Sequence, residues 1–227
     1  MRVLRSLVFY AVFYGATVGF VVASLIVLAT LPAARFRAVP NAWSRFHRWC
    51  VERILGIAVR EEGPRPVGPA LYALKHESFF EAIDLAALLQ NPVPFGKEEL
   101  YRIPGWGRAA RAYGSVQVMR SAGAKGLRTM LADAQRFAGS GRPLAIFPEG
   151  TRVPHGSRPD LQSGFAGLYK LLGLPVVPVA VDSGPTYHLW WKRRGTITFR
   201  FGDAIPPGLP REEIEASVHA AINALNG

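Results

Sequence analysis

The stretch LYALKHESFFE, residues 71–81, contains the features from which the rest of the chain is interpreted. Its apolar beginning, residues 71–74, predicts a short buried strand. The apolar pattern that follows predicts a helix, with Ser78 at the N-cap and Glu81 three residues later. His76 is therefore expected on the turn between the strand and the helix, with a carboxylate in the first helical turn.

The spacing of His76 and Glu81 is compatible with a catalytic pair. Five residues apart on one helix, the two side chains would point about 140° away from each other. With the histidine on the turn, the carboxylate reaches back to an imidazole nitrogen, which gives a general base and the group that orients it. A simpler alternative remains open, in which Ser-x-x-Glu is a capping box and Glu81 only satisfies a backbone N–H. His76-Glu77 also begins the zinc-protease pattern His-Glu-x-x-His, but Phe80 occupies the second histidine position, so no metal site is expected.

The composition limits the classes of function. A chain of 227 residues suits one domain with a sizeable core, and a hydrophobic content of 49% suggests a membrane segment. The net charge of +11 favours polyanionic partners, which are nucleic acids, anionic lipid surfaces or phosphorylated substrates. The single cysteine, Cys50, excludes an internal disulfide framework and a thiolate metal cluster.

The N-terminal region contains a long apolar segment. No residue from Leu7 to Ala34 carries a charge, and this length is sufficient to cross a bilayer. More arginines follow the segment than precede it, which predicts that the remainder of the chain faces the cytoplasm. An alternative fits nearly as well: this segment and the next helix dip into one leaflet. That next helix, residues 41–55, is amphipathic and combines tryptophans with arginines, so we expect it either at the lipid headgroups or packed on the domain.

The remaining pattern alternates strands with helices. After a turn region at 61–68, we expect strands at 93–95, 115–119, 144–147, 176–181 and 196–201. Helices are expected at 124–138 and 165–172 and at the C-terminus, and a loop at 103–107. Such alternation predicts an α/β fold with a central, mostly parallel sheet flanked by helices. The active site of such a sheet lies outside the carboxyl ends of its strands, where His76, Arg120 and residues 149–152 are expected.

Three motifs in fixed order identify a resemblance: His76-Glu-Ser-Phe-Phe-Glu81, Phe147-Pro-Glu-Gly-Thr-Arg152 and Val177-Pro-Val179. Together they resemble the glycerolipid acyltransferases, and in particular the 1-acylglycerol-3-phosphate acyltransferase family, which makes phosphatidic acid. The resemblance runs from about residue 72 to residue 205. It implies membrane-anchoring helices over residues 1–60 and an acyltransferase domain over residues 61–227.

The resemblance also implies roles for individual residues. His76 takes the proton from the acceptor hydroxyl, and Glu81 orients the imidazole. The residues implied in binding the acceptor and its phosphate are Lys97, Arg120, Glu149, Gly150, Thr151 and Arg152. Glu149 either contacts the acceptor or braces its loop.

The chain departs from the family's pattern at three positions. Members usually carry aspartate at Glu81, asparagine at Lys75 and often lysine at Gln162. Asp84 is the alternative partner of His76.

The expected reaction moves a fatty acyl group from an acyl thioester to the free hydroxyl of lysophosphatidic acid. The thioester is on coenzyme A or acyl carrier protein and acts as co-substrate, so neither a cofactor nor a metal is expected. Another lysolipid acceptor, such as a lyso-ornithine lipid, is the alternative, and a non-catalytic membrane adaptor is a further class. The expected location is the inner cell membrane, with the catalytic domain facing the cytoplasm. The aromatic and basic segment 188–194 is interpreted as a lipid contact and not as a nucleic-acid site, and the four histidines other than His76 as surface or helix residues.

Overall fold

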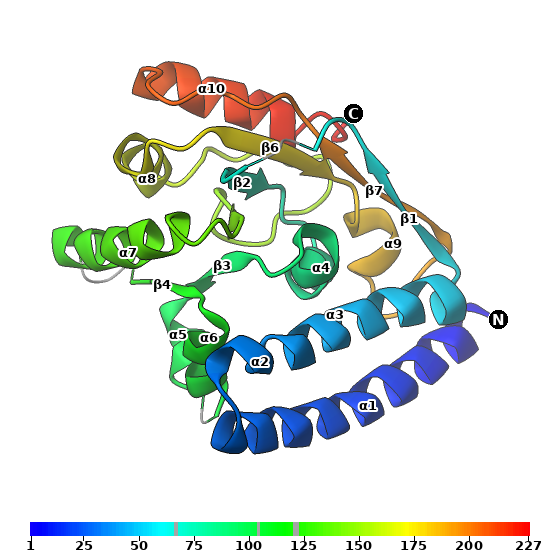
Figure 1. Cartoon of the computed structure of the whole chain (residues 1–227). Coiled ribbons are helices and arrows are strands. Elements are labelled where there is room, and N and C mark those ends of the chain that lie inside the picture. Colours follow the sequence, from blue (N-terminus) through cyan, green and yellow to red (C-terminus); the bar gives the residue numbers. More distant parts are fainter. Residues whose placement is uncertain (66–67, 104, 120–122) are drawn as a thin grey trace.

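A seven-stranded sheet forms the centre of the molecule, and helices cover both of its faces (Figure 1). The computed structural model describes residues 1–65, 68–103, 105–119 and 123–227. The strands are β1 Ile57–Glu62, β2 Leu71–Leu74, β3 Val93–Lys97, β4 Val116–Val118, β5 Leu144–Ile146, β6 Val176–Val181 and β7 Gly195–Phe201. Their order in the sheet is β1-β7-β6-β2-β5-β3-β4. All neighbours pair in parallel except β6 and β7, so the expected mostly parallel α/β sheet is confirmed.

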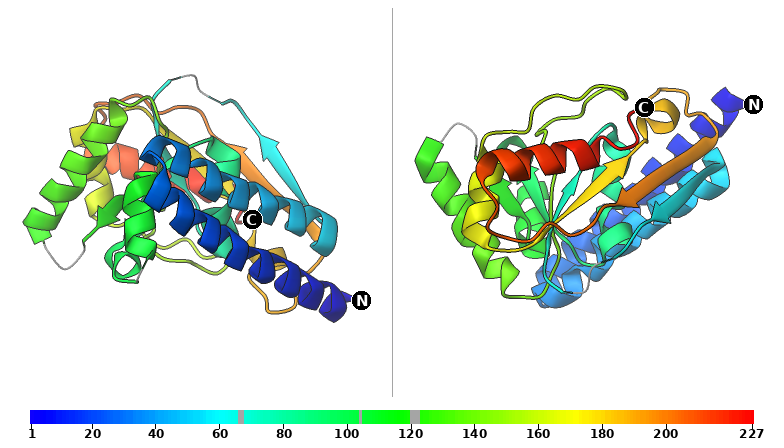
Figure 2. Two further views of the ribbon diagram at one scale, coloured as in Figure 1. Left: turned by 60° about the horizontal axis from the view of Figure 1, so that its bottom comes forward. Right: turned by 90° about the horizontal axis from the view of Figure 1, so that it is seen from above.

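Ten α-helices and one π-helical turn are found in the described part of the chain. They are α1 Arg2–Thr30, α2 Ala33–Phe36, α3 Ala38–Cys50 with the π-helical turn Val51–Leu55, α4 Phe79–Leu89, α5 Glu98–Tyr101, α6 Trp106–Tyr113, α7 Gly123–Ala138, α8 Gly164–Leu172, α9 Gly184–Tyr187 and α10 Arg211–Ile222. Helices α7, α8 and α10 lie on one face of the sheet, and α4 with α3 and α1 on the other (Figures 1 and 2).

The alternation of side chains along the central strand explains why the core has two halves. Tyr72 and Leu74 of β2 pack in the cluster that includes α1, α3 and α4, whereas Leu71 and Ala73 pack in the cluster of α7, α8 and α10. Successive side chains of a strand point to opposite faces, so one strand contributes to both halves. The same alternation decides which way the residues after β2 point.

Several elements differ from the sequence-based expectation: the short helices α2, α5 and α9 were not expected, and strand β1 and helix α6 change the expected order. Strand β1 was not expected, because its sequence lacks the apolar pattern of a buried strand. It lies at the edge of the sheet, its last three residues, Arg60 to Glu62, are charged and exposed, and only Ile57 is fully buried. It also spans the expected boundary between residues 60 and 61. Helix α6 begins inside the loop expected at 103–107. Gly107 is required there by close packing, because a Cβ on it would lie 2.1 Å from the carbonyl oxygen of Tyr101.

The N-terminal helix α1 lies along α3 and contributes to the core (Figures 1 and 2). Phe9 and Phe13 are buried, and Trp43 Nε1 of α3 donates to Thr17 Oγ1 at 3.0 Å. Most of the apolar surface of α1 is nevertheless left uncovered. Among the described residues, α1 is the one helix that is long and apolar enough to cross a membrane.

His47 was expected to be a surface or helix residue, and it lies in helix α3. It is fully buried, and its Nε2 lies 2.7 Å from the hydroxyl of Tyr187. Burial, together with the nearby charges of Lys192 and Arg48, lowers the pKa of His47 from 6.5 to about 3. Helix α3 therefore packs on the domain through its polar side, while Trp49 on its other side is exposed.

Candidate active site

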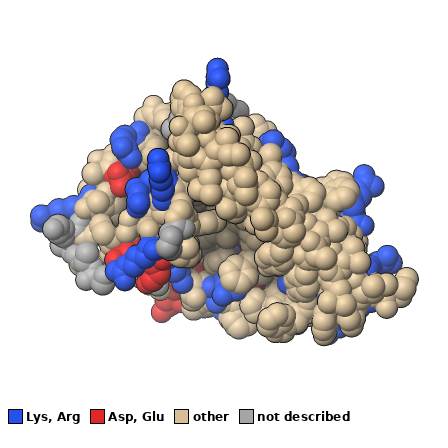
Figure 3. Space-filling model, turned by 90° about the horizontal axis from the view of Figure 1, so that it is seen from below, with Lys and Arg blue, Asp and Glu red and all other residues tan. Residues whose placement is uncertain are grey.

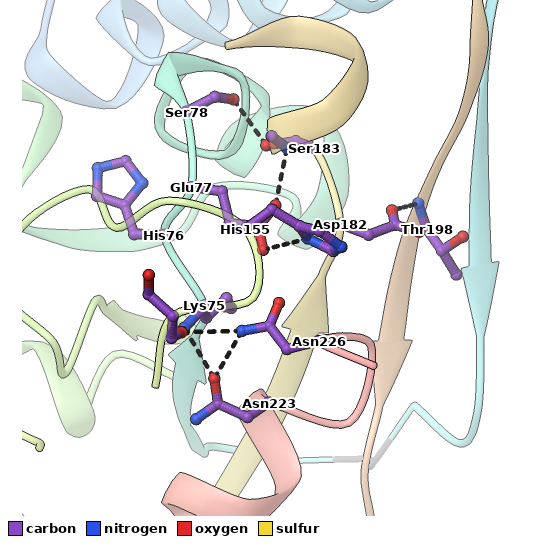
Figure 4. A network of polar contacts seen from close by, with 12 residues as sticks. Lys75, His76, Glu77, Ser78, His155, Asp182, Ser183, Thr198, Asn223 and Asn226 are labelled. Atoms are coloured by element: carbon purple, nitrogen blue, oxygen red, sulfur yellow. Dashed lines mark hydrogen bonds and ion pairs between the residues drawn. The ribbon is translucent and has the colours of Figure 1, made fainter. Parts of the chain in front are cut away.

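The turn after β2 is built as the sequence predicts. Ser78 is the N-cap of α4, and its Oγ accepts a hydrogen bond from the backbone N–H of Phe80 at 3.0 Å. Glu81 Oε2 accepts from the backbone N–H of Ser78 at 3.1 Å, which completes the capping box. The side-chain alternation of β2 continues into the turn: Figure 4 shows Lys75 directed toward α10 and His76 directed away from it.

His76 and Glu81 lie next to each other. His76 Nδ1 is 3.4 Å from Glu81 Oε2, and its ring stacks on Phe147 with 4.1 Å between ring centroids. Nδ1 is buried and makes no hydrogen bond within the described residues, while the ring lines a cavity. The distance is that of an ion pair and longer than a good hydrogen bond, which is common in sites without substrate. Glu81 therefore both caps the helix and faces the imidazole, so the capping box does not exclude a pair with His76, whose catalytic role stays a prediction.

The second motif reaches the same place through backbone contacts. The N–H of Val153 donates to the carbonyl oxygen of His76 at 2.8 Å, and the N–H of His76 donates to Glu149 Oε2 at 3.4 Å. Gly150 has a φ of 71°, a left-handed conformation that favours glycine, and it turns the chain after β5. Because β2 and β5 are parallel neighbours, their carboxyl ends bring the two motifs together.

Glu149 is held by a fully buried cation. Lys75 Nζ lies 2.5 Å from Glu149 Oε1, and it also donates to the carbonyl oxygen of Ser157 and to Asn223 Oδ1, both at 2.8 Å (Figure 4). Both charged side chains are completely buried. Of the two roles expected for Glu149, this geometry favours bracing of the loop. Lys75 supplies the charge that compensates the Glu149 carboxylate.

Asp84, the alternative partner of His76, is engaged elsewhere. Arg48 of α3 donates from Nε to Asp84 Oδ1 at 2.9 Å and from a terminal nitrogen to Oδ2. Burial raises the pKa of Asp84, and the hydrogen bond and charge of Arg48 oppose this shift. Asp84 thus attaches α4 to α3, and Glu81 is the carboxylate near the imidazole.

Two partners near the site were not anticipated from the sequence. Glu77 Oε1 lies 2.9 Å from His155 Nδ1, and Glu77 Oε2 accepts from the backbone N–H of Gly184 at 2.7 Å. Burial raises the pKa of Glu77, while the hydrogen bonds from Gly184 and His155 lower it. Ser183, just before Gly184, contacts Glu81. The position of Ser183 directly after β6 was a usable signal, since the strand-end rule applies to every parallel strand of the sheet.

A cavity of about 1420 Å³ connects the motifs with the apolar helices. His76, Lys97, Gly150 and Arg152 line it, together with Trp43 and apolar side chains of α1 from Phe20 to Leu28. Arg152 lies over the ring of Phe79 at 3.8 Å, and among the described residues no carboxylate pairs with it. Figure 3 shows the hollow beside a broad uncharged surface that is bordered by Lys and Arg side chains.

Three of the expected binding residues are not placed in this cavity. Glu149 is not part of its lining and is buried against Lys75. Thr151 is exposed and is not part of the cavity lining, and Arg120 lies outside the described residues. Gln162 lines the cavity, but its amide donates to the carbonyl oxygen of Glu149 at 3.3 Å.

The chemistry available at the site is that of acid–base catalysis. The described residues contain no group of three or more His, Cys, Asp or Glu side chains placed to hold a metal ion. A histidine beside a buried carboxylate, facing a cavity that also contains an unpaired arginine, provides a base and an anion-binding group. The cavity's apolar part accommodates a hydrocarbon chain.

Comparison with known proteins agrees with this geometry. Residues 56–182 match the family model described as Acyltransferase. A 1-acyl-sn-glycerol-3-phosphate acyltransferase from Pseudomonas aeruginosa is 28% identical over 210 residues, which is 90% of this chain and 82% of that protein. One from Helicobacter pylori is 31% identical over 110 residues, covering 48% of this chain and 46% of that protein. The crystal structure of the 1-acyl-sn-glycerophosphate (LPA) acyltransferase from Thermotoga maritima superposes with a TM-score of 0.74 at 21% identity. It covers 100% of this chain and 98% of the other, and it shows the shared fold.

Proposed function

This chain belongs to the acyltransferase family, and from that premise we propose that it transfers a fatty acyl group to the free hydroxyl of lysophosphatidic acid, giving phosphatidic acid. One observation supports this proposal above the others. A single cavity contains a histidine with a carboxylate beside it, an arginine without an acidic partner among the described residues, and the apolar side chains of α1. An amphipathic substrate with a hydroxyl, a phosphate and an acyl chain needs these three kinds of contact.

The proposed mechanism uses His76 as the base. Its Nδ1 faces Glu81, so Nε2 is the nitrogen left for the acceptor hydroxyl. As the hydroxyl oxygen attacks the thioester carbonyl, Nε2 takes its proton, and the tetrahedral intermediate then expels the thiolate. The imidazolium returns the proton to the thiolate, which leaves as a free thiol, and the new ester is complete. A positioned base contributes typically ~10²–10⁴-fold, and Glu81 stabilises the imidazolium during the step.

The acceptor phosphate is proposed to bind at Arg152. A guanidinium presents two parallel N–H donors to phosphate oxygens, and stacking on Phe79 keeps its plane fixed. Lys97 lines the same cavity and adds positive charge. Glu149, neutralised by Lys75, holds the loop that carries Gly150 and Thr151. Arg120 remains a prediction from the resemblance.

The substrates are proposed to be reached at a lipid surface. Much of α1 is exposed and apolar, and the segment 188–194 is attached to its N-terminal half: Tyr10 Oη donates to the carbonyl oxygen of Trp190 at 2.5 Å, and Arg2 Nε to that of Trp191 at 2.7 Å. The Trp190 side chain is 85% exposed. Because α1 is bound along the domain over much of its length, this packing favours insertion into one leaflet over a full crossing. A cytoplasmic orientation remains a prediction from the arginine distribution.

A donor and acceptor panel tests the proposal. Detergent-purified protein is offered lysophosphatidic acid with acyl-coenzyme A or with acyl carrier protein thioester, and free thiol and phosphatidic acid are measured. We expect both products with at least one donor, and about 10²–10⁴-fold less with His76→Ala. Product only with another lysolipid would instead support the alternative acceptor. Membrane binding without turnover on any acceptor, unchanged in His76→Ala, would support a non-catalytic adaptor.

A further inference from the structure

Ser183 donates a hydrogen bond to the carboxylate that faces His76, from an element 102 residues later in the chain. It follows β6, the parallel neighbour of β2, and immediately precedes α9. Its hydroxyl donates to Glu81 Oε1, and both side chains are fully buried. Sequence motifs do not mark this serine, and its contact with Glu81 depends on the order of the strands.

The proton arrangement around Ser183 is determined by its neighbours. Ser78 Oγ already accepts from the N–H of Phe80, and it lies 2.7 Å from Ser183 Oγ (Figure 4). Since Ser183 uses its one proton on Glu81 Oε1, the proton of Ser78 is left for Ser183 Oγ or for Glu81 Oε2, which lies 3.3 Å away. Both hydroxyl groups therefore lie within hydrogen-bond distance of the Glu81 carboxylate.

The two oxygens of Glu81 are held by different elements. Oε2 is fixed by the N-cap of its own helix and lies toward His76, while Oε1 is fixed by Ser183. A glutamate side chain has three rotatable torsions, and with one anchored oxygen the carboxylate can still pivot about that contact by coupled changes of these torsions. With both oxygens anchored, the carboxylate plane is defined. The described residues within bonding distance of Glu81 provide no Lys or Arg, so its charge remains available to the imidazole.

We infer that Ser183 is a positioning residue, which holds the Glu81 carboxylate in the orientation that His76 requires as the base of acyl transfer. The inference rests on the proposed function of His76 and Glu81 and adds a third member to the pair. It predicts that loss of the Ser183 hydroxyl acts on kcat and not on substrate binding, because Ser183 is fully buried behind Glu81 and does not line the cavity.

Ser183→Ala tests the inference, with Thr186→Val as the matched control. Thr186 lies on α9 and is buried, but its hydroxyl donates to the backbone carbonyl of Ser183 and does not touch Glu81. We expect Ser183→Ala to lower kcat about tenfold, with KM for both substrates within about twofold of wild type, and Thr186→Val to retain kcat. A Ser183→Ala enzyme with wild-type kcat, or with raised KM at unchanged kcat, would overturn the inference.

A double-mutant cycle with Glu81→Gln separates positioning from general structural damage. If Ser183 acts through Glu81, adding Ser183→Ala to Glu81→Gln lowers kcat less than about twofold further; an additive, tenfold further loss contradicts the inference. Should Ser183→Ala not fold, Ser183→Cys carries the same cycle, since its slightly larger thiol leaves no cavity and is a weaker donor. Absence of acyl transfer by the wild type refutes the proposed function, whereas normal kcat of the Ser183 variants in an active, His76-dependent enzyme refutes this inference alone.

Discussion

Two buried carboxylates near the His76 turn, Glu81 and Glu149, are held in opposite ways. Glu149 is paired with a buried lysine and belongs to the cluster that includes the end of α10. Glu81 receives hydrogen bonds from the backbone N–H of Ser78 and from the hydroxyls of Ser183 and Ser78, and among the described residues the basic group paired with it is the imidazole of His76. The two carboxylates are equally buried but differ in their partners. Glu149, which has its own cation, is a structural brace. Glu81, which has none, is free to support the charge that appears on His76 in the proposed reaction.

The largest effect on stability is expected from removal of Lys75, the lysine that is paired with Glu149. Lys75→Met leaves the charge of Glu149 buried without compensation, which should destabilise the protein by about 3–5 kcal/mol. The double variant Lys75→Met with Glu149→Gln should recover most of that loss, because no charge remains to be solvated. Chemical unfolding in detergent measures both values. If the single and the double variant were equally stable, Glu149 would not depend on the charge of Lys75, and the contrast with Glu81 would fail.

The corresponding change at Glu81 should lower kcat more than it lowers stability. Glu81→Gln is expected to lower kcat about 10²-fold, because the imidazolium loses its carboxylate, while unfolding free energy falls by only about 1 kcal/mol. Unfolding curves and steady-state kinetics on the same preparation give both numbers. A stability loss as large as that of Lys75→Met would make Glu81 a brace as well.

Arg152 extends the comparison to the loop that Glu149 braces. Arg152→Lys should raise KM for lysophosphatidic acid by about tenfold with little change in kcat, because lysine keeps the charge and loses the planar two-point contact. Arg211→Ala, at the remote start of α10, is the control and should leave KM unchanged. Unaltered kinetics of Arg152→Lys would remove Arg152 from the acceptor site.

His47 provides a third buried group, one whose partner is the neutral hydroxyl of Tyr187. Its pKa is about 3 in the fold and 6.5 in the unfolded chain, so between pH 6.5 and about 3 the unfolded state binds the proton and the folded state does not. Stability should therefore fall as pH decreases from 6.5 to about 3, by at most ~1.4 kcal/mol per pH unit from this residue. His47→Leu combined with Tyr187→Phe should flatten this part of the profile, measured by unfolding at several pH values. If the stability of the double variant fell with pH as steeply as that of the wild type, His47 would not be the source of this pH dependence.

The sequence by itself determined the local part of the site. The apolar run of β2, the Ser78 cap and the position of Glu81 three residues later follow from short-range periodicity and capping rules, and the structure contains them as expected. The strand-end rule likewise placed His76 and the loop of Glu149 at one edge of the sheet. The cap and the strand depend on residues within a few positions of one another, and the shared edge follows from a general rule for parallel sheets, so the sequence is sufficient to predict both.

The tertiary structure alone decided which partner each buried group received. Lys75 with Glu149, Asp84 with Arg48 and Glu81 with Ser183 are separated by 74, 36 and 102 residues. A charged or polar side chain is compatible with many partners, and only the order of the strands and the packing of α3, α9 and α10 select one. The sequence thus pointed to both carboxylates, and long-range packing paired Glu149 with a lysine and left Glu81 beside His76.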